Sequence, residues 1–158
     1  MPPKTRYTSS EVTDLPVLWS GDVAVAGGGS AGCAAATAAS RSGARVLLIE
    51  SGAFLGGTGV RVLDTFYGFY APGPGNERVV GGIGWEICEL LLEDGSAFER
   101  PNTYGMGTGV TYEPESLKLI WDQVTTDAGV SVLLYGLVTG VVMVGSAITE
   151  LVLETKQG

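Results

Sequence analysis

The most constraining feature of the sequence is the run VAVAGGGSAGCAAATAAS, which occupies residues 23–40. Asp22–Ala26 is a short apolar stretch bounded by glycines, as expected of a buried parallel strand. Ser30–Ser42 is rich in alanine and predicts a helix that ends at Gly43. Arg45–Glu50 then predicts a second buried strand. A strand–turn–helix–strand unit of this kind is almost always parallel and right-handed.

The glycines between the first strand and the helix match the pattern G-x-G-x-x-G. Gly27 permits a tight turn, Gly29 lets the backbone approach a pyrophosphate, and Gly32 lets helix and strand pack closely. Gly28 is expected to be the least constrained of the group. The helix N-terminus offers free N–H groups to phosphates, and Glu50 at the next strand end accepts hydrogen bonds from a ribose. The alternative is a glycine-rich turn in an unrelated α/β protein.

Composition excludes several classes of function. Nine basic against seventeen acidic residues give a net charge of −8, and no basic stripe suits a nucleic acid. The chain has no histidine, which removes the commonest general base and metal ligand. Cys33 and Cys88 form no disulfide or zinc pattern, and no metal site is predicted.

The uncharged run from Ala128 to Thr149 has the length of a membrane span. It is rich in valine and interrupted by glycines, which favours successive strands over a membrane helix. The predicted strands are Ser131–Tyr135, Leu137–Val144 and Ala147–Thr155, with a tight turn at Gly145-Ser146. The N-terminus lacks the apolar core of a signal peptide, so a cytoplasmic location without membrane contact is expected.

The rest of the chain is predicted in less detail. Residues 1–20 are expected to be an irregular lead-in, followed by one domain over residues 21–158. Residues 59–112 are expected to form an irregular insertion, with a helix at Ile83–Leu92 as its best-defined part. Pro114 suits the first turn of a further helix that Gly129 stops.

A second glycine cluster, in ESGAFLGGTG, follows the acidic strand end. At this point the sequence resembles FAD-dependent oxidoreductases of the two-dinucleotide-binding-domain superfamily, and in particular the fumarate-reductase-like bacterial group. The segments LPVLWSGDVAVAGGGSAG, IESGAFLGGTG, VVGGIGWEICELL and the stretch from VTYEPES to the terminal ITELVLETKQG carry the resemblance over nearly the whole chain. It implies an α/β fold: a Rossmann-like FAD-binding domain with a parallel sheet plus a β-meander or hairpin.

The motif and the resemblance together imply FAD as cofactor. In such proteins the glycine-rich segment after the ribose-binding acid lies along the pyrophosphate, and a later strand contacts adenine through its backbone, here at Val138. The implied cofactor-binding residues are Gly27, Gly29, Ser30, Ala31, Gly32, Glu50, Ser51, Gly56, Gly57, Thr58 and Val138. Removal of the Glu50 carboxylate is expected to weaken FAD binding and leave the fold intact.

Family members continue past the final hairpin to a segment that closes over FAD and carry a substrate domain. The resemblance therefore implies that these residues are incomplete without a partner polypeptide, either the second subunit of a split flavoenzyme or the remainder of a larger one. The partner would complete both the FAD site and the site of a small-molecule substrate.

By the resemblance, GVRVLDTFYGFYA passes near the flavin. Its polar members Arg61, Asp64, Tyr67 and Tyr70 are the candidate catalytic residues, for stabilising reduced flavin, binding a substrate carboxylate or moving a proton. The alternative is that they only pack over the cofactor or the partner. Weaker candidates are Tyr104, Met106 and Thr108, and a covalent link from Cys88 to FAD is a further alternative.

Three functions remain open. The first is the FAD-binding part of an oxidoreductase that transfers hydride from a small organic substrate to FAD. The second is a non-catalytic subunit that carries FAD while its partner supplies the substrate chemistry. The third is an NAD(P)-binding module, which the second glycine cluster disfavours.

Overall fold

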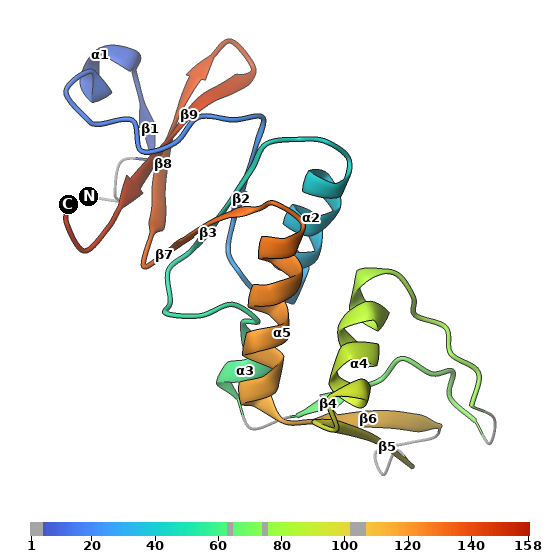
Figure 1. The fold of residues 1–158 in the computed structure, drawn as a ribbon. Coiled ribbons are helices and arrows are strands. Elements are labelled where there is room, and N and C mark those ends of the chain that lie inside the picture. The colour runs from blue at the N-terminus through green and yellow to red at the C-terminus, as the bar shows by residue number, and fades with distance from the viewer. Residues whose placement is uncertain (1–4, 63–64, 74–75, 102–106) are drawn as a thin grey trace.

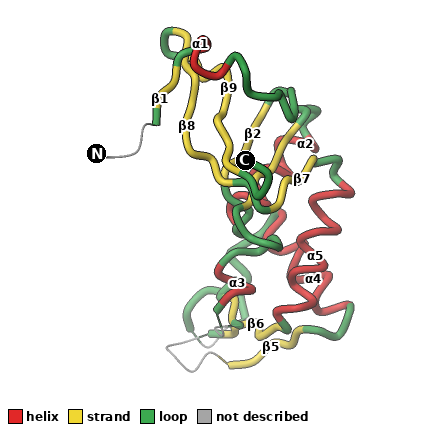
Figure 2. The backbone as a smooth tube through the Cα atoms, turned by 90° about the vertical axis from the view of Figure 1, so that its left-hand side faces the viewer, coloured by secondary structure: helices red, strands yellow, loops and turns green. Residues whose placement is uncertain are grey.

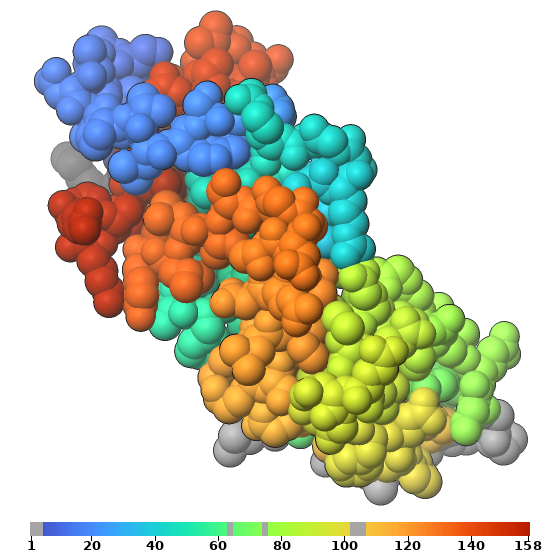
Figure 3. All heavy atoms as spheres, viewed as in Figure 1, coloured from blue at the N-terminus to red at the C-terminus, as the bar shows by residue number. Residues whose placement is uncertain are grey.

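The computed structural model describes residues 5–62, 65–73, 76–101 and 107–158. The described chain is elongated, with a parallel sheet and its helices in the middle (Figures 1 and 2). A hairpin and the N-terminal segment lie at one end. A second lobe around helix α4 (Ile83–Glu93) forms the other end, as the space-filling view shows (Figure 3).

The central sheet contains β2 (Val23–Ala26), β3 (Val46–Glu50) and β7 (Ser131–Leu134), in the order β2-β3-β7 and all parallel. Every residue of β3 is buried, because β3 is the middle strand and both of its faces are covered. Val46 and Leu48 belong to the main core, whereas Ile49 lies against Gly136 on the opposite face. The predicted parallel unit is confirmed.

Two long helices pack beside this sheet, α2 (Ser30–Arg41) and α5 (Pro114–Asp127). α2 ends before Gly43, whose φ of 94° suits glycine, and α5 ends before Gly129 at φ 86°. Pro114 occupies the first turn of α5, where Glu113 accepts a hydrogen bond from the Ser116 amide at 2.7 Å. The apolar face of α5 is buried against α2 and α4, with Leu117, Ile120, Trp121 and Val124 in the core.

The predicted hairpin forms from β8 (Leu137–Val144) and β9 (Ala147–Glu154), with Gly145 in the turn at φ 62°. The expectation of an irregular lead-in was wrong in part. β1 (Arg6–Tyr7) pairs in parallel with β8, and α1 (Ser9–Val12) follows, with a capping box between Thr8 and Glu11. Strand pairing with distant β8 organises this segment, and a local pattern of two residues does not reveal it.

The uncharged run near the C-terminus forms strands, as expected. Within the described residues, no helix is both long and apolar enough to cross a membrane.

The region 59–112 is more regular than predicted. It contains α3 (Thr58–Arg61, which begins just before it), β4 (Phe66–Tyr67), α4, β5 (Ala97–Pro101) and β6 (Thr108–Tyr112). The strands form an antiparallel sheet in the order β4-β6-β5. Val110 and Tyr112 of β6 are buried, and α4 packs its Cys88 side against this small sheet. The strands are short and glycine-flanked, so their pairing depends on α4 and not on a strong local pattern.

Candidate dinucleotide-binding site

The first glycine loop joins β2 to α2. Gly27 adopts φ 104°, a conformation that favours glycine, and its amide donates to the Ile49 carbonyl at 2.7 Å. Gly29 is the N-cap of α2, and no side chain caps this helix. The amides of the first turn, at Ser30 and Ala31 and their neighbours, are therefore available to a ligand with negative charge.

The space around three glycines of this loop differs sharply. A Cβ on Gly29 would have only the Gly57 Cα nearby, at 3.9 Å, so this face of the loop is open. A Cβ on Gly32 would lie 1.8 Å from the Gly27 carbonyl oxygen, which confirms the close helix–strand packing. The expectation for Gly28 was wrong: a Cβ there would lie 2.6 Å from Leu55 and 2.9 Å from Glu50. Gly28 is constrained because the chain after Glu50 folds back under it.

Replacement of Gly32 with alanine should destabilise the protein by about 1–3 kcal/mol, because the added methyl group overlaps a backbone carbonyl that cannot rotate away. Urea unfolding monitored by circular dichroism measures this loss. Gly81→Ala is the matched control, since a Cβ at Gly81 meets nothing within 4 Å. Equal unfolding midpoints for the two variants would contradict the packing role of Gly32.

The second glycine segment lies directly beside the first. The Gly56 amide donates to the Gly28 carbonyl at 2.8 Å, and Gly29 and Gly56 form an isolated parallel bridge. Gly57 adopts φ 55°, and a Cβ on it would lie 2.7 Å from the Gly29 Cα. The second segment must therefore lack a side chain at Gly57, where it meets Gly29. The result is a strip of bare backbone next to the uncapped start of α2, which suits a pyrophosphate.

Glu50 ends β3 beside this strip, with its side chain buried. Its carboxylate accepts from the Gly28 amide at 2.8 Å, from the Gly52 amide at 2.6 Å and from Arg61 at 2.6 Å. Burial by itself raises the pKa of this carboxyl, but the two amides and Arg61 together hold the pKa below its ordinary value. Glu50 is therefore an ionised acceptor at neutral pH.

A hollow of about 230 Å³ opens at the carboxyl ends of β2 and β3. Its lining includes Gly27, Ser51 and Val138, three of the residues predicted to bind the cofactor, together with Ala26, Ile49, Gly136 and Leu137. Open α/β sheets bind ligands at the carboxyl ends of their strands. The contact of Val138 with adenine stays a prediction.

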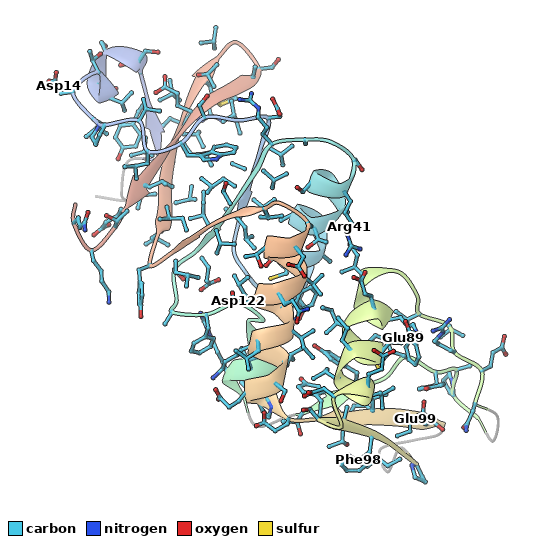
Figure 4. The ribbon with its side chains drawn as sticks, in the orientation of Figure 1. Asp14, Arg41, Glu89, Phe98, Glu99 and Asp122 are labelled. Atoms are coloured by element: carbon cyan, nitrogen blue, oxygen red, sulfur yellow. The ribbon has the colours of Figure 1, made fainter. Side chains whose placement is uncertain are left out.

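The described candidate catalytic residues do not share one site. Arg61 pairs with Glu50. Tyr67 stacks on Tyr112, with ring centroids 4.5 Å apart, and burial raises the pKa of its hydroxyl. Tyr70 donates to Glu99, which Figure 4 labels in the second lobe; burial and this carboxylate raise the pKa of Tyr70 to about 12.

The remaining candidates add little to the geometry. Asp64, Tyr104 and Met106 lie outside the described residues. Thr108 begins β6 and donates to Asn76. Cys88 is buried between α4 and the small sheet, and burial raises the pKa of its thiol to about 11, which keeps it protonated.

The pairing of Arg61 with Glu50 and the approach of Gly52 to both are the features that the sequence did not reveal. Arg61 follows Glu50 by eleven residues through a turn of unspecified shape, so spacing gave no signal. The acidic residue at the strand end gave only an indirect signal: a buried carboxylate needs hydrogen-bond donors that compensate its charge, but the pattern does not say which residues supply them.

Residues 22–158 match the family model described as FAD dependent oxidoreductase. The fold is similar to that of 3-ketosteroid-Δ4-(5α)-dehydrogenase from Rhodococcus jostii RHA1, with a TM-score of 0.64 and 18% identity over 99% of this chain and 45% of that one. The fold is also similar to that of L-amino acid deaminase from Proteus myxofaciens, with a TM-score of 0.57 and 14% identity over 88% of this chain and 43% of that one. THI4 from Thermovibrio ammonificans gives a TM-score of 0.55 and 20% identity over 87% of this chain and 48% of that one.

This chain thus spans less than half the length of each of these three proteins. No curated protein matches the sequence. The glycine strip, the uncapped helix and the buried acid fit the pyrophosphate and ribose of FAD, the cofactor that the family match indicates. The chain belongs to the FAD dependent oxidoreductase family, with a Rossmann-like FAD-binding fold.

Proposed function

We propose that this chain is the FAD-binding part of an oxidoreductase in which a small organic substrate gives a hydride to the flavin. The observation that carries the proposal is the strip formed by Gly29, Gly56 and Gly57 beside the uncapped N-terminus of α2. FAD, when bound, supplies the hydride acceptor. The chain itself binds the pyrophosphate through backbone amides and the ribose through Glu50.

The test starts from the purified 158-residue chain mixed with FAD. We expect saturable binding in a 1:1 ratio, measured by the change in flavin fluorescence, with NAD⁺ and NADP⁺ unable to displace FAD. Anaerobic addition of candidate small organic substrates should then bleach the flavin absorbance in the presence of the completing polypeptide. Absence of FAD binding under all of these conditions would contradict the proposal.

A second candidate is a non-catalytic subunit that holds FAD for its partner. It is favoured by the engagement of the described candidate catalytic side chains: Arg61 with Glu50, Tyr67 against Tyr112, and Tyr70 with Glu99. Tyr67→Phe and Tyr70→Phe distinguish the two functions. If either variant slows bleaching by substrate while FAD affinity is unchanged, this chain contributes to the chemistry.

We further propose that a second polypeptide, a separate subunit or the remainder of a larger flavoenzyme, docks along β2. Within the described residues β2 pairs with β3 alone, so it is an edge strand whose outer side offers unpaired backbone N–H and C=O groups to another strand. The segment before β2 also carries three exposed apolar residues, Leu15, Val17 and Leu18, whose exposed fractions are 53%, 80% and 61%. Docking should protect the amides of residues 23–26 from hydrogen exchange, and unchanged exchange in the complex would contradict this placement.

A further inference from the structure

Four donors surround the Glu50 carboxylate. Oε1 accepts from the Gly52 amide and from Arg61 Nη2, each at 2.6 Å, and lies 3.3 Å from the Ser51 hydroxyl. Oε2 accepts from the Gly28 amide at 2.8 Å, which is its one donor among the described residues. A carboxylate offers about four lone-pair positions. Oε1 is therefore filled, whereas Oε2 keeps one position for a ligand.

Arg61 reaches Glu50 across the loop between β3 and α3. α3 begins next to Gly57 of the second glycine segment and packs beside α5 (Figure 1). The guanidinium lies over Gly52, where a Cβ would be 1.9 Å from Nη2, and its carbon is 5.4 Å from the centre of the Phe54 ring. The side chain thus links the start of α3 to the end of β3.

Arg61 adds a positive charge to the two backbone amides that stabilise the Glu50 carboxylate. The Glu50 side chain is 7% exposed and that of Arg61 is 42% exposed. The free-energy penalty of removing a charge from water therefore falls on the carboxylate and not on the guanidinium. Lys118 of α5 lies near the same loop, over Phe54, but its ammonium pairs with Glu115. Cys33 of α2 donates its thiol to the Gly28 carbonyl at 3.2 Å, and burial raises the pKa of this thiol to about 11, so it stays neutral.

Asp122 of α5, labelled in Figure 4, is exposed, and its negative charge also raises the pKa of Cys33. Arg61 is therefore the one cation that bonds directly to Glu50 among the described residues. The backbone amides of Gly28 and Gly52 add dipoles but no net charge.

We propose that Arg61 is a positioning residue for the cofactor: it occupies Oε1 and so keeps Glu50 ionised, with Oε2 presented to a ribose hydroxyl of FAD. The inference rests on FAD as the ligand of the glycine strip. It assigns Arg61 to the adenosine half of the site, away from the chemistry at the flavin. It also predicts that Glu50 binds one ribose hydroxyl and not both.

The experiment compares Arg61→Met, Arg61→Lys and wild type by FAD titration between pH 3.5 and pH 8. Methionine keeps an apolar stem over Phe54 and removes the charge. We expect Arg61→Met to raise the Kd for FAD about tenfold at pH 7.5. The loss of affinity on acidification should also move to higher pH, because the pKa of Glu50 rises without its cation. Arg61→Lys, which keeps the positive charge, should restore most of the FAD affinity and most of its wild-type pH dependence.

Arg45→Met is the matched control. Arg45 precedes β3 at the end opposite to Glu50 and pairs with Asp22, with both side chains exposed. The change in net charge is the same, and FAD affinity should not change. Wild-type affinity and pH dependence in Arg61→Met would overturn the proposal. Tighter binding would also overturn it, because the guanidinium would then compete with the ribose.

A second measurement needs no FAD. The titration of the Glu50 side-chain carboxyl, followed by NMR in the free chain, should shift to higher pH in Arg61→Met and stay unchanged in Arg45→Met. An unshifted titration would contradict the role of Arg61 itself. Failure of the wild-type chain to bind FAD would instead contradict the cofactor assignment, so the two failures are distinguishable.

Discussion

Replacement of Gly29 with valine should raise the Kd for FAD roughly 100-fold or more while the protein stays folded. The Gly29 face of the strip is open, since a Cβ there has only the Gly57 Cα within 4 Å. A branched side chain would fill this space and separate the pyrophosphate from the α2 amides. Each charge-assisted hydrogen bond lost in this way costs about 1.5–3 kcal/mol. Flavin fluorescence titration measures the affinity.

The control for this variant is Gly81→Val, in which the same side chain enters open space outside the strip. Its FAD affinity and unfolding midpoint should equal those of the wild type. Gly29→Ala tests the size dependence and should fall between the wild type and Gly29→Val. Normal FAD stoichiometry and affinity in Gly29→Val would show that the pyrophosphate lies elsewhere.

Replacement of Glu50 with glutamine should raise the Kd for FAD about 10- to 100-fold, because the neutral amide is a weaker acceptor for the ribose. The structure changes the expectation that the fold is unaffected. The Gly28 and Gly52 amides both need the carboxylate, and an amide nitrogen cannot accept from them. A loss of about 1–3 kcal/mol in the free energy of unfolding should accompany the loss of affinity.

This second effect has a defined pH dependence. The pKa of Glu50 is lowered in the folded protein, so its ionised form stabilises the fold fully above the ordinary value of 4.5. That contribution is lost as the pH falls through the folded pKa. The difference in unfolding free energy between wild type and Glu50→Gln should therefore shrink on acidification below pH 4.5, as urea denaturation at several pH values would measure.

Glu86→Gln is the matched control, since Glu86 also pairs with an arginine, Arg41, but with both side chains more than a third exposed. Its effect on stability should be small and its FAD affinity unchanged. Equal effects of Glu86→Gln and Glu50→Gln on FAD binding would contradict a specific ribose contact.

The central α/β unit could be predicted because its signals are local and agree with each other. An apolar run bounded by glycines, an alanine-rich helix with Gly43 after it, and Val46–Glu50 each specify one element. Their periodicity also separates the uncharged C-terminal run into strands. The antiparallel sheet β4-β6-β5 was missed, because its strands are short and become regular only by pairing with one another and packing on α4.

The site divides in the same way. The sequence by itself determined the first glycine loop and the acid at the next strand end, because the turn at Gly27 and the close packing at Gly32 are backbone requirements that only glycine meets. Tertiary structure decided which partners those residues have. It placed Gly28 against Glu50 and Leu55, and it brought Arg61 to the same carboxylate. These contacts depend on the path of a loop, and a loop's path follows from packing against the rest of the fold and not from its own sequence pattern.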